Sequence, residues 1–166
     1  MKEEIEKRRE HNVSTSREII SELQQYLVDK ADGVNIVKGR VTDLFPLKHT
    51  FADELYLRQM SMQKNSFLVG AIHKHLHVWF LLAGHITVVT EESTEEYVAP
   101  CYTVSTPGSK RVIFANEDSI FVNVHKNPDN TRDIDVLDEQ IVCDTWQEYN
   151  EYIKNKTFWL SIKFIL

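Results

Sequence analysis

The alternation of apolar and polar positions divides the chain into a helical start, a β-rich middle and a helical end. Apolar residues recur at helical spacing between Ile19 and Val28, which predicts an amphipathic helix from about 16 to 30. Residues 1 to about 13 are charged and aperiodic, so we expect them to be frayed or ordered by a partner. We therefore assign 1–32 to an N-terminal charged arm and helix.

The middle of the chain, 33–126, has short apolar runs separated by turn residues and no helical pattern between them. Such a succession is typical of an antiparallel sandwich or a small β-barrel. The fold class is therefore predicted to be mainly β. The expected strands are 34–42, 54–62, 66–73, 77–90, 96–105, 110–115 and 119–125.

Helical spacing returns in the last part of the chain, 127–166. Two helices are predicted, from Asp133 to Val142 and from Asp144 to Lys154, with acidic residues on a solvated face. The tail 158–166, FWLSIKFIL, is unusually apolar for a chain end. We expect it to dock on the domain or on a second subunit, with a membrane contact as the alternative.

Composition and charge narrow the class of protein. The net charge of −6 and the pI near 5.6 give no basic surface for nucleic acid or for an anionic membrane. Cys101 and Cys143 lie far apart without a CxxC motif, so we expect reduced thiols in the cytoplasm. The start, MKEEIEKRRE, does not have the pattern of a signal peptide, and we find no apolar run of about 18 residues that would cross a bilayer.

Three histidines stand at two-residue spacing in the stretch GAIHKHLHVWFLLAG, which spans 70–84. Neutral imidazole is a common metal ligand, and positions i, i+2 and i+4 share one face of a strand. On a straight strand, however, His73 and His77 would lie roughly 13 Å apart. They approach one another only if residues 74–76 turn.

The same stretch resembles the first motif of the cupin superfamily, whose proteins are double-stranded β-helix or jelly-roll barrels. Gly84 takes the place of the closing glycine, which puts His77 in the place of the glutamate and His73 in that of the second histidine. The first histidine then falls on Ala71. An alternative register takes His73 and His75 as the histidine pair and shortens the loop between motif positions.

The segment PGSKRVIFAN, 107–116, resembles the second cupin motif in turn chemistry and length. Arg111 or Val112 stands where the family has its last histidine. Because that histidine and the glutamate both differ, the family's set of three histidines and one glutamate does not carry over to this chain.

The likeness extends from His49 to His125, about half the chain, and is similar to small uncharacterised cupin proteins of bacteriophages and some bacteria. It implies a cupin barrel with an N-terminal helix and C-terminal helices. The phrases that carry it are PLKHTFADELYLRQM, GAIHKHLHVWFLLAGHITVVTE, APCYTVSTPGSKRVIFANED and SIFVNVH.

Further candidates lie on the neighbouring predicted strands. His125 shares a strand face with Phe121 and Asn123 and is a possible third metal ligand. Tyr56 and Arg58 share a face of the strand 54–62, and an inward Arg58 or Arg111 would suit a carboxylate or phosphate. The competing interpretation is that each arginine pairs with a surface glutamate.

Two functions remain open from the sequence. The first is a barrel that binds a divalent metal (Zn, Fe, Ni or Mn) through His73 and His77, helped by His75 or His125, together with a small anionic metabolite. Such a protein could be a metal-dependent enzyme, with Arg58, Tyr56 or Arg111 at the ligand. The alternative is a non-catalytic binding, sequestering or assembly module of phage type. We expect a homodimer or larger homo-oligomer in either case.

Overall fold

A computed structural model describes residues 2–30 and 44–163, with side chains described as far as residue 157. The predicted strand 34–42 and the docking of the apolar tail lie outside the described residues and side chains. In the described part no helix is long and apolar enough to span a bilayer.

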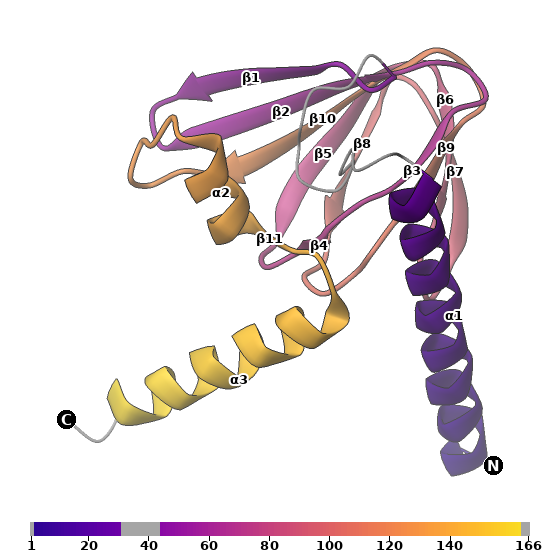
Figure 1. Cartoon of the computed structure of the whole chain (residues 1–166), viewed down its shortest axis with the longest axis vertical. Helices are drawn as coiled ribbons and strands as arrows, with labels where there is room; N and C mark the ends of the chain where they lie inside the picture. The colour runs from indigo at the N-terminus through magenta and orange to yellow at the C-terminus, as the bar shows by residue number, and fades with distance from the viewer. Residues whose placement is uncertain (1, 31–43, 164–166) are drawn as a thin grey trace.

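Two antiparallel sheets face each other and form the jelly roll, which confirms the predicted fold class (Figure 1). The larger sheet has the order β1-β2-β10-β5-β8, with bounds Leu47–Ala52, Leu55–Met62, Ser119–Lys126, His77–Ala83 and Cys101–Ser105. The smaller has the order β3-β9-β6-β7, with bounds Phe67–Val69, Val112–Ala115, His85–Val89 and Thr94–Val98. A short ladder joins β4 (Ile72–His73) to β11 (Val142–Cys143).

The core lies between the two sheets because alternate residues of each strand point inward. Along β5 the inward positions are His77, Trp79 and Leu81, and all three are buried. Their apolar members pack against Phe121 of β10 and Ile86 of β6. The same alternation that fills the core therefore places His77 at one end of it.

Gly84 separates β5 from β6, so the predicted strand 77–90 is two strands. Its φ of +87° lies in the left-handed region, where a side chain is strained. A Cβ at this position would meet Ser119 Oγ at 2.2 Å and the Asp118 carbonyl oxygen at 2.3 Å. The chain turns here against the start of β10, and only glycine fits.

Other boundaries also differ from prediction. The strand predicted at 96–105 divides at Ala99-Pro100 into β7 and β8, since proline has no N–H to donate to a ladder. Strand β1 was not predicted; it alternates between half-buried and exposed positions and has little apolar signal.

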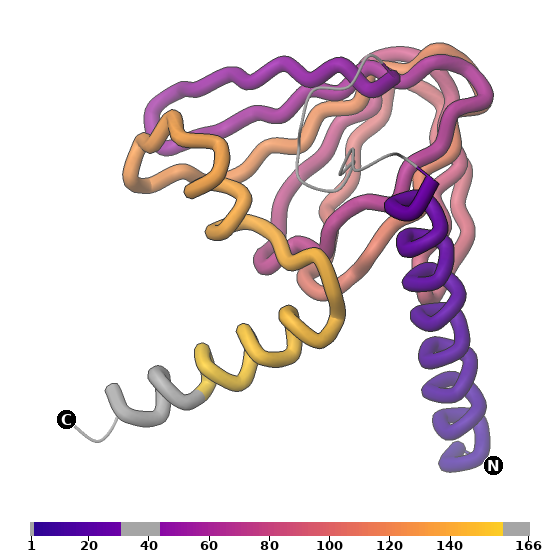
Figure 2. Tube along the Cα trace, viewed as in Figure 1, coloured from indigo at the N-terminus to yellow at the C-terminus, as the bar shows by residue number. Residues whose placement is uncertain are grey.

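The described residues form three helices beside the barrel. α1 (Lys2–Lys30) includes residues 2–13, so the expected fraying of this stretch was wrong; Thr15 lies inside the helix and donates to the His11 carbonyl at 3.1 Å. α2 (Ile134–Ile141) and α3 (Trp146–Lys163) confirm the two predicted C-terminal helices. α3 extends away from the barrel and α2 covers one end of it, whereas α1 contacts the barrel through its second half and its N-terminal end reaches beyond it (Figure 2).

Replacing Gly84 by alanine should lower the free energy of unfolding by about 2 kcal/mol, because the new Cβ is both strained and in collision. Gly70→Ala is the matched control, since a Cβ there meets only the Arg111 carbonyl oxygen at 3.5 Å, an ordinary contact. Urea unfolding of both variants measures the difference. Equal stability of the two variants would contradict this account of the turn.

Candidate functional site

A bend brings His73 and His77 together. β4 ends at His73, residues 74–76 bend, and β5 begins at His77. The two ring centroids are 4.0 Å apart, far closer than a straight strand allows. The predicted turn is therefore confirmed, and the structure favours the register that pairs His73 with His77.

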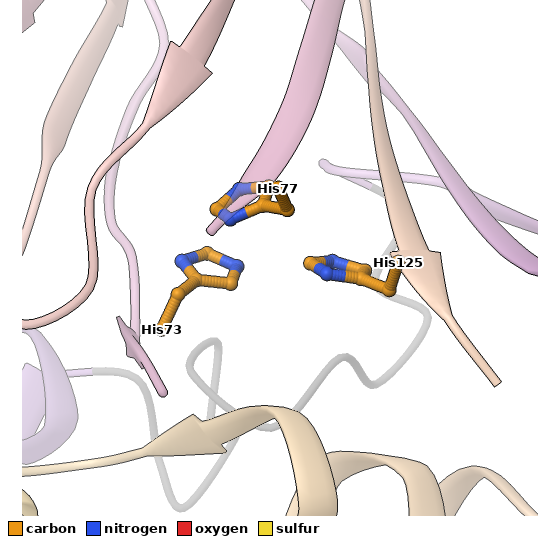
Figure 3. Close-up of side chains that lie close together, drawn as sticks. All are labelled: His73, His77 and His125. Atoms are coloured by element: carbon orange, nitrogen blue, oxygen red, sulfur yellow. The ribbon is translucent and has the colours of Figure 1, made fainter. Parts of the chain in front are cut away.

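His125 completes a cluster of three rings. It lies near the end of β10, which pairs with β5, and it points inward like Phe121 on the same strand. Its ring centroid is 5.2 Å from that of His73 and 4.7 Å from that of His77. One nitrogen from each ring lies within 4.8 Å of the others, and the three rings face one another in Figure 3.

His75 does not join this cluster, although the sequence placed it among the candidate ligands. It lies inside the bend, and its ring meets His125 edge-on with centroids 5.8 Å apart. The lysines Lys126, Lys156 and Lys74 add to partial burial in lowering its pKa. The bend that joins the other two histidines turns His75 toward these lysines.

Arg111 inserts its guanidinium into the cluster. Its Nη2 lies 3.3 Å from His73 Nδ1, 3.3 Å from His77 Nε2 and 2.7 Å from Ser105 Oγ. A guanidinium only donates hydrogen bonds, so both imidazole nitrogens accept and their lone pairs point at Nη2. A metal ion would use the same lone pairs and would therefore take the place of these two hydrogen bonds.

The loop before β9 holds Arg111 in this position. Gly108 N donates to the His73 carbonyl at 3.0 Å, and Gly70 N donates to the Arg111 carbonyl at 2.7 Å. From the other side, Trp146 Nε1 of α3 donates to the Gly108 carbonyl at 3.1 Å. The first turn of α3 and the chain around β4 thus fix the loop together.

The proton on His77 is placed by its neighbours. His77 Nδ1 lies 3.4 Å from the His75 carbonyl oxygen, which can only accept. Nδ1 therefore carries the proton, and Nε2 is the acceptor for Arg111. Asn123 Oδ1 lies 3.1 Å from the same Nε2; because Nε2 is an acceptor in this tautomer, we assign the Asn123 amide in the rotated orientation, with its NH₂ toward the ring.

All three rings are neutral at pH 7. Burial, followed by the charge of Arg111, lowers the pKa of His77 to about 4 and holds that of His73 well below its usual value. Burial, followed by His77 and Arg58, lowers the pKa of His125 to about 2. Burial also lowers the pKa of Arg111 to about 10, so the guanidinium stays charged.

The described residues offer no carboxylate within ion-pair distance of Arg111. Its side-chain hydrogen bonds to them all involve Nη2, which leaves Nη1 and Nε for a ligand. A cavity of about 410 Å³ opens beside it, with Ser105, Trp79 and Tyr97 in the lining. We refer to this space as the Arg111 cavity.

Tyr56 is buried and Arg58 is half-buried, and the two side chains are engaged with each other. Arg58 Nε donates to Tyr56 Oη at 2.8 Å, and Arg58 Nη2 donates to Asp138 of α2. Tyr56 Oη in turn donates to His49 Nδ1 at 2.7 Å. Tyr56 also packs against Leu137 of α2. The partner of Arg58 is thus a half-buried aspartate, and Arg111 is left as the charged group for a ligand.

The donor set fits a divalent metal after a small closure. Three neutral imidazoles suit Zn²⁺ and other first-row ions. Nitrogens bound to one ion at usual bond lengths lie about 3.4 Å apart, so the 4.8 Å spread must contract. His125 Nδ1 is buried without a hydrogen-bond partner among the described residues, as expected for a ring held for a ligand.

No family model and no curated protein matches the chain. Solved structures similar to it include KdgF from Halomonas sp., with 13% identity over 53% of this chain and 83% of that one, and TM-score 0.46. An RmlC-like cupin from Shewanella frigidimarina has 16% identity over 57% and 83%, and TM-score 0.46. Clostridium difficile EutQ has 15% identity over 60% and 86%, and TM-score 0.45.

These neighbours are cupin and RmlC-like barrels, as the resemblance in the sequence predicted. At such identities and TM-scores they say nothing about a metal, ligand or activity of this chain. The description of the barrel rests on the strand order and register of the chain itself.

Acid should destabilise the metal-free protein. The unfolded histidines titrate near pH 6.5, above the folded pKa values of about 4 for His77 and about 2 for His125, so the unfolded state binds more protons as pH falls below 6.5. Each ring then removes up to about 1.4 kcal/mol of stability per pH unit. Urea unfolding between pH 7 and 5 measures the slope. His125→Phe should make the dependence of stability on pH shallower, whereas His11→Phe, on exposed α1, should leave it unchanged. Equal slopes in the native protein and both variants would contradict the assignment of His125 as a buried neutral ring.

Proposed function

We propose that the barrel binds a small anionic ligand through Arg111 beside a divalent metal held by His73, His77 and His125. The observation that carries this proposal is the convergence of three neutral imidazoles, two of which accept hydrogen bonds from one buried guanidinium. Two features support it: His125 Nδ1 has no hydrogen-bond partner among the described residues, and Arg111 lines the Arg111 cavity.

Electrostatics links the two ligands. A buried charge is costly unless it is paired, and Arg111 has hydrogen bonds but no described counter-charge. A divalent ion among neutral ligands would add two more positive charges to the same region. An anion bound by Arg111 in the adjoining cavity, whose lining includes none of the three histidines, would offset this charge, so each ligand should strengthen the binding of the other.

The chemistry available to such a site is that of a Lewis acid, which polarises a bound oxygen ligand. Arg111 would orient the anion by hydrogen bonds from two nitrogens, and Ser105 Oγ would keep Nη2 in place. The buried setting strengthens these interactions because little water competes with them.

A non-catalytic scaffold is the second candidate, favoured by the long helix α1. Only Ile20 of its 29 residues is fully buried, whereas Ile5, Ile19 and Tyr26 are exposed. Such a helix offers apolar contacts to another chain, including a second copy in a homodimer. A protein that binds neither metal nor small anions would favour this candidate.

Zinc binding to untagged protein tests the metal site. We expect one Zn²⁺ per chain by titration calorimetry and at least a ten-fold loss of affinity in His73→Ala, His77→Ala and His125→Ala, since each removes one ligand. His85→Ala is the control, because His85 lies on β6 beside Glu96 and outside the cluster. Equal zinc affinity in all four variants would overturn the metal site.

The same titration in the presence of acetate tests the link to Arg111. Acetate should tighten zinc binding by the native protein, because it offsets the adjacent positive charges. Arg111→Gln should bind zinc more tightly than the native protein without acetate and should lose the acetate effect. A native zinc affinity that acetate leaves unchanged would count against the paired site.

A further inference from the structure

The charged residues that line the Arg111 cavity are unevenly paired. Glu91 forms an ion pair with Arg17 of α1 at 3.3 Å, and Glu92 forms one with Arg9 at 3.3 Å. Neither Arg111 nor Glu95, which also lines the cavity, has an ion-pair partner among the described residues. One free positive and one free negative group therefore share the same space.

Glu95 is held in position as a carboxylate. Tyr97 Oη donates to Glu95 Oε2, and Ser93 Oγ donates to Glu95 Oε1 at 3.1 Å. These hydrogen bonds lower the pKa of the Glu95 carboxyl group. The side chain is exposed on β7, so it lies at the mouth of the cavity, whereas Arg111 is buried.

Aromatic rings contribute to the cavity wall. Trp79 and Tyr97 both line it and meet edge-to-face, with centroids 4.8 Å apart. Trp79 is buried in the core, and Tyr97 carries the hydroxyl group that holds Glu95. The cavity thus combines a cationic interior, an apolar wall and an anionic mouth. Its volume of about 410 Å³ is in the range of small-molecule sites.

We infer that the ligand of this cavity is a zwitterion, with a carboxylate on Arg111, a short apolar middle against Trp79 and Tyr97, and an ammonium group on Glu95. This inference rests on the proposed anion site at Arg111 and specifies the class of ligand. A dianion would meet the Glu95 carboxylate at the mouth and be disfavoured there.

Pairs of ligands of equal length, with and without an ammonium group, separate the contribution of Glu95 from that of Arg111. We would titrate the full chain with the series from glycine to 6-aminohexanoate and with the carboxylates of equal length, acetate to hexanoate. At least one amino acid should bind about two- to five-fold tighter than its partner carboxylate, the gain of a partly exposed ion pair. The series varies the span between the carboxylate and the ammonium group.

Variants test which residue causes the preference for the amino acid over the plain carboxylate. Glu95→Gln should remove the preference for the amino acid while leaving the affinity for the plain carboxylate unchanged. Glu92→Gln should retain the preference, because Glu92 is already paired with Arg9. Arg111→Gln should weaken both ligands at least ten-fold.

The outcomes distinguish this inference from the function on which it rests. If no amino acid binds tighter than its carboxylate, or if Glu95→Gln keeps the preference, the zwitterion is overturned while the anion site stands. If neither series binds or raises the melting temperature of the native protein, the anion site fails, and the zwitterion fails with it.

Discussion

A buried positive charge beside the histidine cluster determines the protonation and the hydrogen bonds of the groups around it. Arg111 is 7% exposed, and taking a guanidinium out of water costs several kcal/mol unless hydrogen bonds replace the lost hydration. Ser105 and the lone pairs of His73 and His77 supply those bonds. The rings must stay neutral to accept, and burial, followed by the positive charge next to them, lowers their pKa values and keeps them neutral.

The fold serves this arrangement through segments that are distant in the sequence. The bend at 74–76 brings two histidines together, and β10 contributes the third from the neighbouring strand. The loop before β9 carries Arg111 and is tied to His73 and to α3. α2 engages Arg58 through Asp138, so this second cation is already paired. Arg111 has no carboxylate partner among the described residues, which is why the proposed anion site is placed there.

The local sequence pattern predicted much of the fold and of the histidine site, and contacts between segments distant in the sequence account for what it did not predict. Alternation gave most strands, and the distance from His77 to Gly84 indicated the bend. The helix over residues 2–13 was missed because its apolar spacing is poor; Arg9 of this stretch forms an ion pair with Glu92 in the β6–β7 turn, next to the pair of Arg17 with Glu91. Local spacing did not predict the contact of Arg111 with Ser105 or that of Arg58 with Asp138. Each of these contacts joins different elements of the fold.

The protonation and metal response of the seven histidines test the central claim most directly. Long-range ¹H–¹⁵N spectra at pH 7 should show His73, His77 and His125 as neutral rings, with His77 protonated on Nδ1. One equivalent of Zn²⁺ should shift the nitrogens of these three rings and leave the other four unchanged. A cationic ring within the cluster, or a zinc response confined to His11, His49, His75 or His85, would contradict the account.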